Sequence, residues 1–232
     1  MNAQLNATTT TVRHAGPNLG LVATVFTVLK LASIFLVSSF ITNPSFPEPS
    51  ATAHDIVAYF QAHPSLVLAC AFLQFGSAIA LGIFVVGVVS QLRFLGVRAA
   101  GADIALFGGL ATALDSAGSA FALWVLSQPG IAQDATLARA LFYLQFAFGG
   151  PGFSVPMGLL LAGVSIVAGF MKLLPRWIVW SGIAIAVVGE LSWFSMIIPG
   201  VLLLIPLTRF PAFAWLITVG FPLPKTIASS SK

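Results

Sequence analysis

Six apolar stretches, each long enough to cross a lipid bilayer as a helix, constrain this chain more than any other feature of its sequence. A helix needs about 20 apolar residues to cross a hydrocarbon core of about 30 Å, because it rises about 1.5 Å per residue. The stretches run over residues 20–41, 65–91, 102–126, 152–171, 177–198 and 201–223. We therefore predict an all-α fold, a polytopic membrane helical bundle of six transmembrane helices with short outer-loop helices.

The composition indicates the same environment. Hydrophobic residues make up 58% of the 232 residues, and charged residues make up only 7%. A soluble domain carries roughly a quarter of its residues as Asp, Glu, Lys or Arg, so this chain cannot cover a water-facing surface. The balance excludes a soluble enzyme and a disordered chain. A disulfide scaffold is excluded as well, because Cys70 is the single cysteine.

The basic residues indicate the orientation of the spans, because Lys and Arg prefer cytoplasmic loops. With a cytoplasmic N-terminus, the basic residues on the inside are Arg13, Arg93, Arg98, Lys172, Arg176, Lys225 and Lys232. The charged residues on the outside are Arg139, Glu48, Asp55 and Asp134. We predict a polar cytoplasmic tail over residues 1–19, a membrane domain over 20–224 and a cytoplasmic tail over 225–232. Since the positive charge is scattered, it is a topology signal and predicts no nucleic-acid partner.

The loop after the first stretch contains a helical pattern. Residues 52–55, Thr-Ala-His-Asp, have the spacing of a capping box, in which a side chain at each end bonds the backbone of the other. Ile56, Tyr59 and Phe60 then fall on one apolar face. We predict a short helix that lies with this face on the outer membrane interface.

The fourth apolar region, residues 135–171, is too long for one straight span. Gly149-Gly150-Pro151-Gly152 interrupts it, and these residues do not continue a helix. We expect an outer helix over residues 134–149, a turn and then the true span. The same break is also consistent with the unwound, ligand-facing segment of a discontinuous helix, and both interpretations stay open.

The most informative residues are the ionisable ones inside the apolar stretches: Lys30, Asp115, Glu190 and Arg209. Each lies about 9 to 14 residues into its stretch, which places it near the bilayer centre. A charge there costs about 2.5 to 3.5 kcal/mol on insertion scales, so these side chains face the bundle interior and pair or neutralise. Arg209 has a second interpretation, because a last helix beginning near Pro206 places it at the outer interface, where its side chain snorkels.

Asp115 has the clearest surroundings. The residues on its helical face are small or polar, namely Gly108, Ala111, Thr112, Gly118, Ser119 and Ala122. Such a stripe meets protein or water and not lipid, and hydroxyl groups on it are able to hydrogen-bond near the carboxylate. We predict a binding site or ion-pair network composed of Lys30, Asp115, Glu190, Arg209, Thr112 and Ser119. Small residues favour packing within the chain or between copies equally, so a homo-oligomer stays open.

Catalytic signatures are scarce. The sequence contains no Gly-x-Ser-x-Gly, His-Glu-x-x-His, phosphate loop or dinucleotide fingerprint, and no histidine lies within a predicted span. His54 and His63 in the outer loop lack a clear set of further metal ligands. We expect no cofactor and no metal, and the sequence favours a protein that is not an enzyme.

Several weak motifs accompany the six stretches between Gly20 and Pro224. They are an outer-loop segment Asp-Ile-Val-Ala-Tyr at 55–59, a basic hinge Leu-Pro-Arg-Trp at 174–177 and a terminal Trp-Leu-Ile-x-x-Gly-Phe at 215–221. In this order they resemble the DUF4386 family of bacterial integral membrane proteins. The resemblance implies a six-helix protein of the bacterial inner membrane. Members often carry an acidic residue near the position of Arg209, and Lys30 is unusual for them, which indicates a rearranged charge pattern.

Three functions are consistent with these residues. In the first, the bundle handles a small solute or a proton through a polar cavity near Asp115. In the second, the protein is structural or binds a partner, and the same charges form a dry ion-pair staple between helices. The third, an intramembrane enzyme that uses Asp115 and Glu190, is the least economical, because Lys30 close to them favours an ion network.

Overall fold

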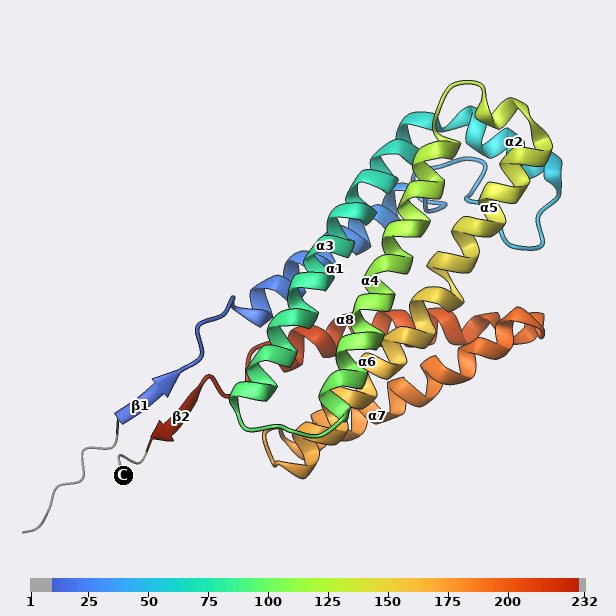
Figure 1. The fold of residues 1–232 in the computed structure, drawn as a ribbon. Helices are drawn as coiled ribbons and strands as arrows, with labels where there is room; N and C mark the ends of the chain where they lie inside the picture. Colours follow the sequence, from blue (N-terminus) through green and yellow to red (C-terminus); the bar gives the residue numbers. More distant parts are fainter. Residues whose placement is uncertain (1–9, 230–232) are drawn as a thin grey trace, which may run out of the picture.

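The computed structural model describes residues 10–229, which fold into a helical bundle (Figure 1). The α-helices are α1 Leu19–Leu36, α2 Ala53–Ala62, α3 Pro64–Phe94, α4 Gly101–Leu126, α5 Ala135–Gly149, α6 Pro151–Phe170, α7 Arg176–Leu191 and α8 Leu204–Gly220. Short 3₁₀ helices lie at Ile131–Gln133, Ser192–Met196 and Pro199–Leu203. Six helical segments are long and apolar enough to span a membrane. The prediction of a six-span, all-α bundle is confirmed.

The first span and the last two have boundaries that differ from the prediction. α1 ends at Leu36, five residues before the predicted end. The hydroxyl of Ser38 bonds the Phe35 carbonyl at 2.7 Å and that of Thr42 bonds the Ser38 carbonyl at 3.1 Å, so local side-chain bonds replace the helical ladder. The junction of the last two spans loosens into 3₁₀ helices on both sides of Pro199, which lacks a backbone donor.

α5 has the predicted bounds to within one residue, and the predicted turn before α6 lies at Gly150. α5 packs along α4 and leads into α6 after one interrupting residue, Gly150 (Figure 1). Together, Ala135–Phe170 make one interrupted candidate span of 36 residues. Pro151 starts α6 where a missing backbone donor costs nothing, so the break stays short.

α2 forms as predicted, and its capping box is confirmed. The Thr52 hydroxyl accepts the Asp55 backbone N–H at 3.2 Å, and the Asp55 carboxylate accepts the Thr52 backbone N–H at 3.3 Å. The expectation that its apolar face lies on the outer membrane interface was wrong. Ile56, Tyr59 and Phe60 are buried in a cluster with side chains of α3, α4 and α5, because these helices extend far enough to meet α2.

The spans form a closed ring of neighbours. α1 contacts α3, α3 contacts α4, α4 contacts α6, α6 contacts α7, α7 contacts α8, and α8 returns to α1. Glycines allow α4 and α6 to approach closely, since a Cβ atom at Gly163 would lie 2.5 Å from the Gly101 carbonyl oxygen. Side chains from all six of these helices meet in the main hydrophobic core.

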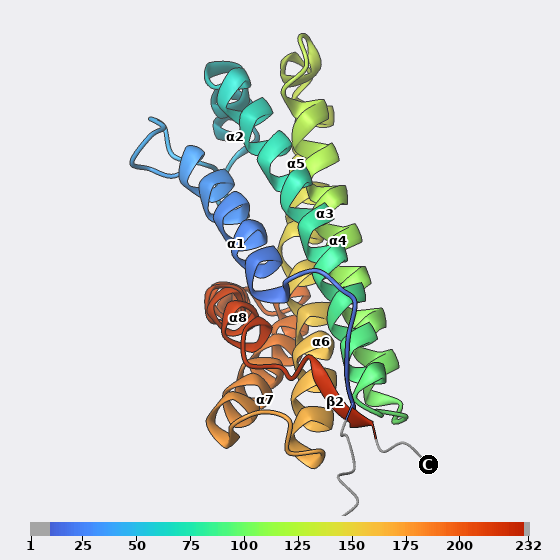
Figure 2. The ribbon, with the colours of Figure 1, turned by 90° about the vertical axis from the view of Figure 1, so that its left-hand side faces the viewer.

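The two ends of the described chain lie together at one end of the bundle (Figures 1 and 2). β1 Thr10–Arg13 pairs antiparallel with β2 Thr226–Ser229. The side chain of Gln91 at the end of α3 donates to the carbonyls of Leu223 and Pro224 at 3.0 and 2.8 Å. The predicted tails, 1–19 and 225–232, extend in part beyond the described residues, and Lys232 lies outside them.

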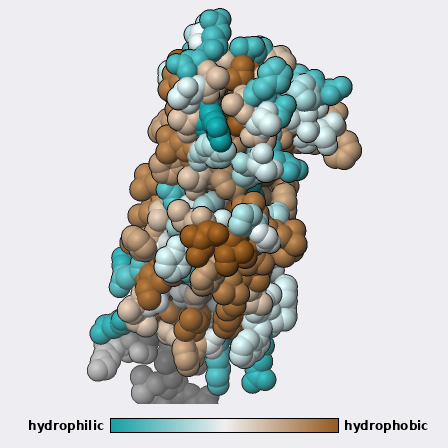
Figure 3. All heavy atoms as spheres, turned by 90° about the vertical axis from the view of Figure 1, so that its right-hand side faces the viewer, coloured by the Kyte–Doolittle hydropathy of each residue, from teal (hydrophilic) through white to brown (hydrophobic). Residues whose placement is uncertain are grey.

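The outer surface matches a bilayer. Figure 3 shows one face of the molecule, on which hydrophobic side chains gather over the middle and hydrophilic side chains gather toward the two ends. Large apolar side chains exposed on the spans include Leu21, Val25, Phe72, Ile79, Phe107 and Leu114. In water such a surface would be costly, whereas lipid covers it without loss.

Candidate functional site

Lys30 lies in the middle of α1 and points into the bundle. Its side chain is only 2% exposed, and its ammonium donates a hydrogen bond to the Ser116 hydroxyl on α4 at 3.0 Å. The Nζ atom also lies 5.3 Å from the centre of the Phe153 ring on α6, within the range of a cation–π contact. Gln74 on α3 donates to the Ser116 backbone carbonyl at 3.2 Å. Four helices therefore meet around one buried cation.

Arg209 reaches the same ring from α8. Its guanidinium carbon lies 5.2 Å from the centre of the Phe153 ring, and an Nη atom donates to the backbone carbonyl of Gly149, the last residue of α5. A helix C-terminus carries partial negative charge, so a guanidinium there is stabilised. The buried Nε atom of Arg209 has no hydrogen-bond partner in the described part of the chain. This inward contact differs from the alternative in which Arg209 snorkels at the outer interface.

No carboxylate lies within 4.0 Å of either cation among the described residues. Within residues 10–229, the one ion pair is Arg93 with Asp103, at 2.5 Å on the exposed surface. Because Lys30 and Arg209 both contact Phe153, their charges are no further apart than the sum of the two distances to its ring. The site is therefore a pair of neighbouring cations.

Asp115 and Glu190 lie beside different parts of α6. A Cβ atom at Gly152 would be 3.2 Å from the Asp115 carboxylate, whereas a Cβ atom at Gly158 would be 2.8 Å from the Glu190 carboxylate. Six residues of helix separate these positions by about 9 Å along the axis and about 240° around it. Asp115 is half-buried and Glu190 is exposed. The structure does not bring the two acids together.

The two predicted hydroxyls have different surroundings. Thr112 bonds the Gly108 carbonyl of its own helix at 2.8 Å and takes no part in the site. Ser119 accepts a hydrogen bond from Gln145 on α5 at 3.2 Å and lies against Gly149. The junction of α5 and α6 therefore gathers Arg209, Asp115 and Ser119, and Lys30 meets it through Phe153.

The sequence prediction did not include Ser116 and Phe153. Ser116 follows Asp115 and lies about 100° further around α4. Ser116 therefore faces α1, whereas the predicted stripe of small and polar residues lies on the face of α4 that carries Asp115. No local signal could have separated Phe153 from the other phenylalanines, of which the chain has 20 in all.

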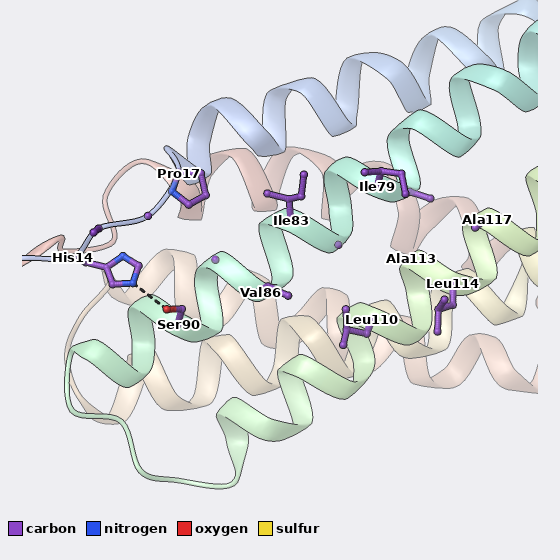
Figure 4. A pocket seen from close by; sticks show the side chains of 15 residues that line it. His14, Pro17, Ile79, Ile83, Val86, Ser90, Leu110, Ala113, Leu114 and Ala117 are labelled. Carbon is purple, nitrogen blue, oxygen red and sulfur yellow. Dashed lines mark hydrogen bonds between the residues drawn. The ribbon is translucent and has the colours of Figure 1, made fainter.

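A separate cavity of about 750 Å³ lies between α3, α4 and the segment before α1 (Figure 4). Apolar side chains such as Ile83, Val86 and Leu110 line it, and His14 bonds the Ser90 hydroxyl at 3.0 Å near one end. Ile79 and Leu114 in its wall are 54% and 72% exposed, so this cavity is a groove on the lipid-facing surface. The four ionisable residues predicted for the site do not line this cavity: Lys30, Asp115, Glu190 and Arg209.

No protein-family model, curated protein or solved structure matches this chain. The class of protein therefore rests on the fold and the composition. Six apolar helices in a bundle with an apolar outer surface define a multi-pass integral membrane protein in a lipid bilayer.

Proposed function

We propose that this membrane protein binds a small anionic solute between Lys30 and Arg209 and moves it across the bilayer. The observation that carries the proposal is the pair of cations at one phenylalanine ring, without a carboxylate within 4.0 Å of either in the described chain. Because their separation is at most the sum of the 5.3 and 5.2 Å ring distances, the two like charges repel by at least roughly 1.6 kcal/mol at an effective dielectric constant of 20. An anion between them replaces this repulsion by two attractions.

Unused hydrogen-bond donors support an anionic ligand. The Lys30 ammonium carries three donors, and Ser116 is its one hydrogen-bond partner among the described residues. The Nε atom of Arg209 is buried and has no described partner. Asp115 lies half-buried at the same helix junction, and we propose that it exchanges a proton with the solute.

A structural role is the second candidate, and a specific contact favours it. Arg209 bonds the last carbonyl of α5, and Lys30 bonds Ser116 across two helices, so the cations also hold the bundle together. In this form of the staple, backbone and hydroxyl oxygens replace the predicted carboxylate partners. Lys30 and Arg209 would then stabilise the fold without binding a solute.

The test is thermal unfolding of the purified full-length protein in detergent with sodium phosphate, sulfate, acetate or succinate, each compared with chloride at equal ionic strength. We expect at least one anion to raise the melting temperature, because a ligand at 100 times its Kd adds about 2.7 kcal/mol to stability. Lys30→Gln and Arg209→Gln should abolish the shift. Arg139→Gln, an exposed basic position on α5, is the matched control and should keep it.

Two outcomes oppose the proposal. If none of the anions shifts the wild-type melting temperature, while Lys30→Gln and Arg209→Gln lower it, the two cations are structural. If an anion stabilises all variants equally, it binds elsewhere. With a ligand identified, uptake of that anion into proteoliposomes, and its loss in the same two variants, tests the transport step.

We also infer that the chain belongs to the DUF4386 family and lies in a bacterial inner membrane with both termini in the cytoplasm. The α3–α4 and α6–α7 connections lie at the end of the bundle where the two described chain ends meet (Figures 1 and 2). Four basic residues lie in or directly beside these connections and support this orientation: Arg93, Arg98, Lys172 and Arg176. A green fluorescent protein fused to the C-terminus should fluoresce. An alkaline phosphatase fused there should be inactive. An active phosphatase would show that the orientation is the opposite of the one proposed.

A further inference from the structure

A groove of about 850 Å³ lies between α6 and α7, where the two helices are joined. Its apolar wall includes Ile166, Val179, Trp180 and Ile183. The helices are close at this point because residue 169 is glycine, at which a Cβ atom would lie 2.9 Å from Val179. The groove is separate from the site of Lys30, Arg209 and Phe153 and shares no residue with it.

Two basic residues line the end of this groove nearest the connection. Lys172 follows α6 and Arg176 begins α7, and both side chains are exposed. None of the residues that line the groove is acidic. In the described chain neither cation forms an ion pair, whereas Arg93 at the same end of the bundle is paired with Asp103. The groove therefore joins an uncompensated positive charge to an apolar channel.

The surrounding surface places this charge at the level of lipid headgroups. Trp177 and Trp180 are 64% and 68% exposed, and Phe170 is 84% exposed. Exposed tryptophan is typical of the boundary between hydrocarbon and headgroups. A ligand that fits both parts of the groove carries an anionic head and a long apolar tail.

We propose that this groove is a binding site for an anionic phospholipid. The headgroup phosphate lies between Lys172 and Arg176, and an acyl chain lies along the apolar wall between α6 and α7. Basic pockets between membrane helices at the cytoplasmic side recognise such headgroups. A free inorganic anion gains nothing from the apolar wall, and a neutral phospholipid gains little from the two cations.

Native mass spectrometry of the purified full-length protein tests this site with equimolar phosphatidylglycerol and phosphatidylcholine. We expect wild type to retain phosphatidylglycerol preferentially. The double variant Lys172→Gln/Arg176→Gln should bind it about 30-fold more weakly, and each single variant about fivefold more weakly, from the usual effect of a basic residue at a membrane surface. Arg98→Gln is the matched control, because this exposed residue lies near the same end but outside the groove.

Fluorescence locates the bound lipid independently. Phosphatidylglycerol with brominated acyl chains should quench Trp180, seen as the difference between wild type and Trp180→Phe, and the double variant should lose this quenching. Equal binding of both lipids by wild type would overturn the proposal. If Arg98→Gln weakens phosphatidylglycerol binding as much as the double variant does, the attraction is diffuse over the surface and the proposal fails. Full displacement of the lipid by inorganic phosphate would also overturn it. The single variants keep the test valid if the double variant fails to fold.

Discussion

Replacing Ser116 by alanine tests what holds the buried charge at the centre of the bundle. Lys30 is 2% exposed, and its ammonium donates to the Ser116 hydroxyl at 3.0 Å. A hydrogen bond to a charged group contributes about 1.5 to 3 kcal/mol, so Ser116→Ala should lower the free energy of unfolding by about that amount. In a Lys30→Met background the charge is absent, and the same substitution should cost little. The expected coupling energy between the two positions is therefore about 1.5 to 3 kcal/mol.

Lys30→Met alone should have a small effect on stability. It removes a cation whose burial costs about 2.5 to 3.5 kcal/mol. It also removes one charged hydrogen bond and a cation–π contact worth about 0.5 to 2 kcal/mol. These contributions nearly cancel, so the net change should stay within about 2 kcal/mol. If a buried carboxylate were the partner, removing the lysine would instead cost about 3 to 5 kcal/mol.

The assay is equilibrium unfolding of the full-length protein in mixed micelles with increasing sodium dodecyl sulfate. Four chains complete the cycle: wild type, Ser116→Ala, Lys30→Met and the double variant. Thr112→Ala is the matched control, because its hydroxyl bonds its own helix and should show no coupling to Lys30→Met. A coupling below about 0.5 kcal/mol between residues 30 and 116 would refute the hydrogen bond as the main partner of the charge. If Lys30→Met lowers the unfolding free energy by more than about 3 kcal/mol, Lys30 has a buried carboxylate partner and the reasoning is wrong.

Three further predictions concern other parts of the fold. Arg209→Met removes a charged hydrogen bond and a cation–π contact but also the cost of burying a cation, so the unfolding free energy should again change by no more than about 2 kcal/mol in the same assay. Gly163→Ala places a Cβ atom 2.5 Å from a carbonyl oxygen and should cost about 1 to 3 kcal/mol, whereas Gly82→Ala, with no atom within 4 Å, should cost nothing. The Thr52 hydrogen bonds hold the pKa of Asp55 below its ordinary value of 3.8. The ionised form is therefore favoured in the folded state, and its contribution is complete above pH 3.8 and lost as the pH falls through the lower, folded pKa. Asp55→Asn should lower the melting temperature at pH 7, and the difference from wild type should vanish in acid.

Local features of the fold were predictable from the chain. The capping box at Thr52 and Asp55 formed as its spacing indicates, because both partners lie within one helical turn. The break at Gly150 was also visible, since glycine and proline act on the backbone at their own positions. The arrangement of α5 was not predictable, because the choice between an outer helix and an extension of α6 depends on its packing against α4.

In the site of Lys30 and Arg209, too, some features were predictable from the sequence and others were not. That Lys30 and Arg209 lie in apolar stretches is a property of sequence position, and it correctly indicated side chains that enter the bundle. Their partners are Ser116 and the Gly149 carbonyl, 86 and 60 positions away along the chain. A carbonyl oxygen has no sequence signature, since every residue carries one. Asp115 lies beside Gly152 at the start of α6 and Glu190 beside Gly158 further along, and neither carboxylate is within 4.0 Å of Lys30 or Arg209.

The sequence by itself determined that this chain has six segments long and apolar enough to cross a membrane, because the length and hydropathy of a stretch decide whether its own backbone and side chains are satisfied in lipid. Only the tertiary structure decided that two cations share the Phe153 ring with no carboxylate within 4.0 Å of either in the described residues. Which side chains meet depends on the rotation and order of α1, α4, α6 and α8 in the ring. That order follows from the close packing of small residues and from contacts between distant segments, which hydropathy does not encode.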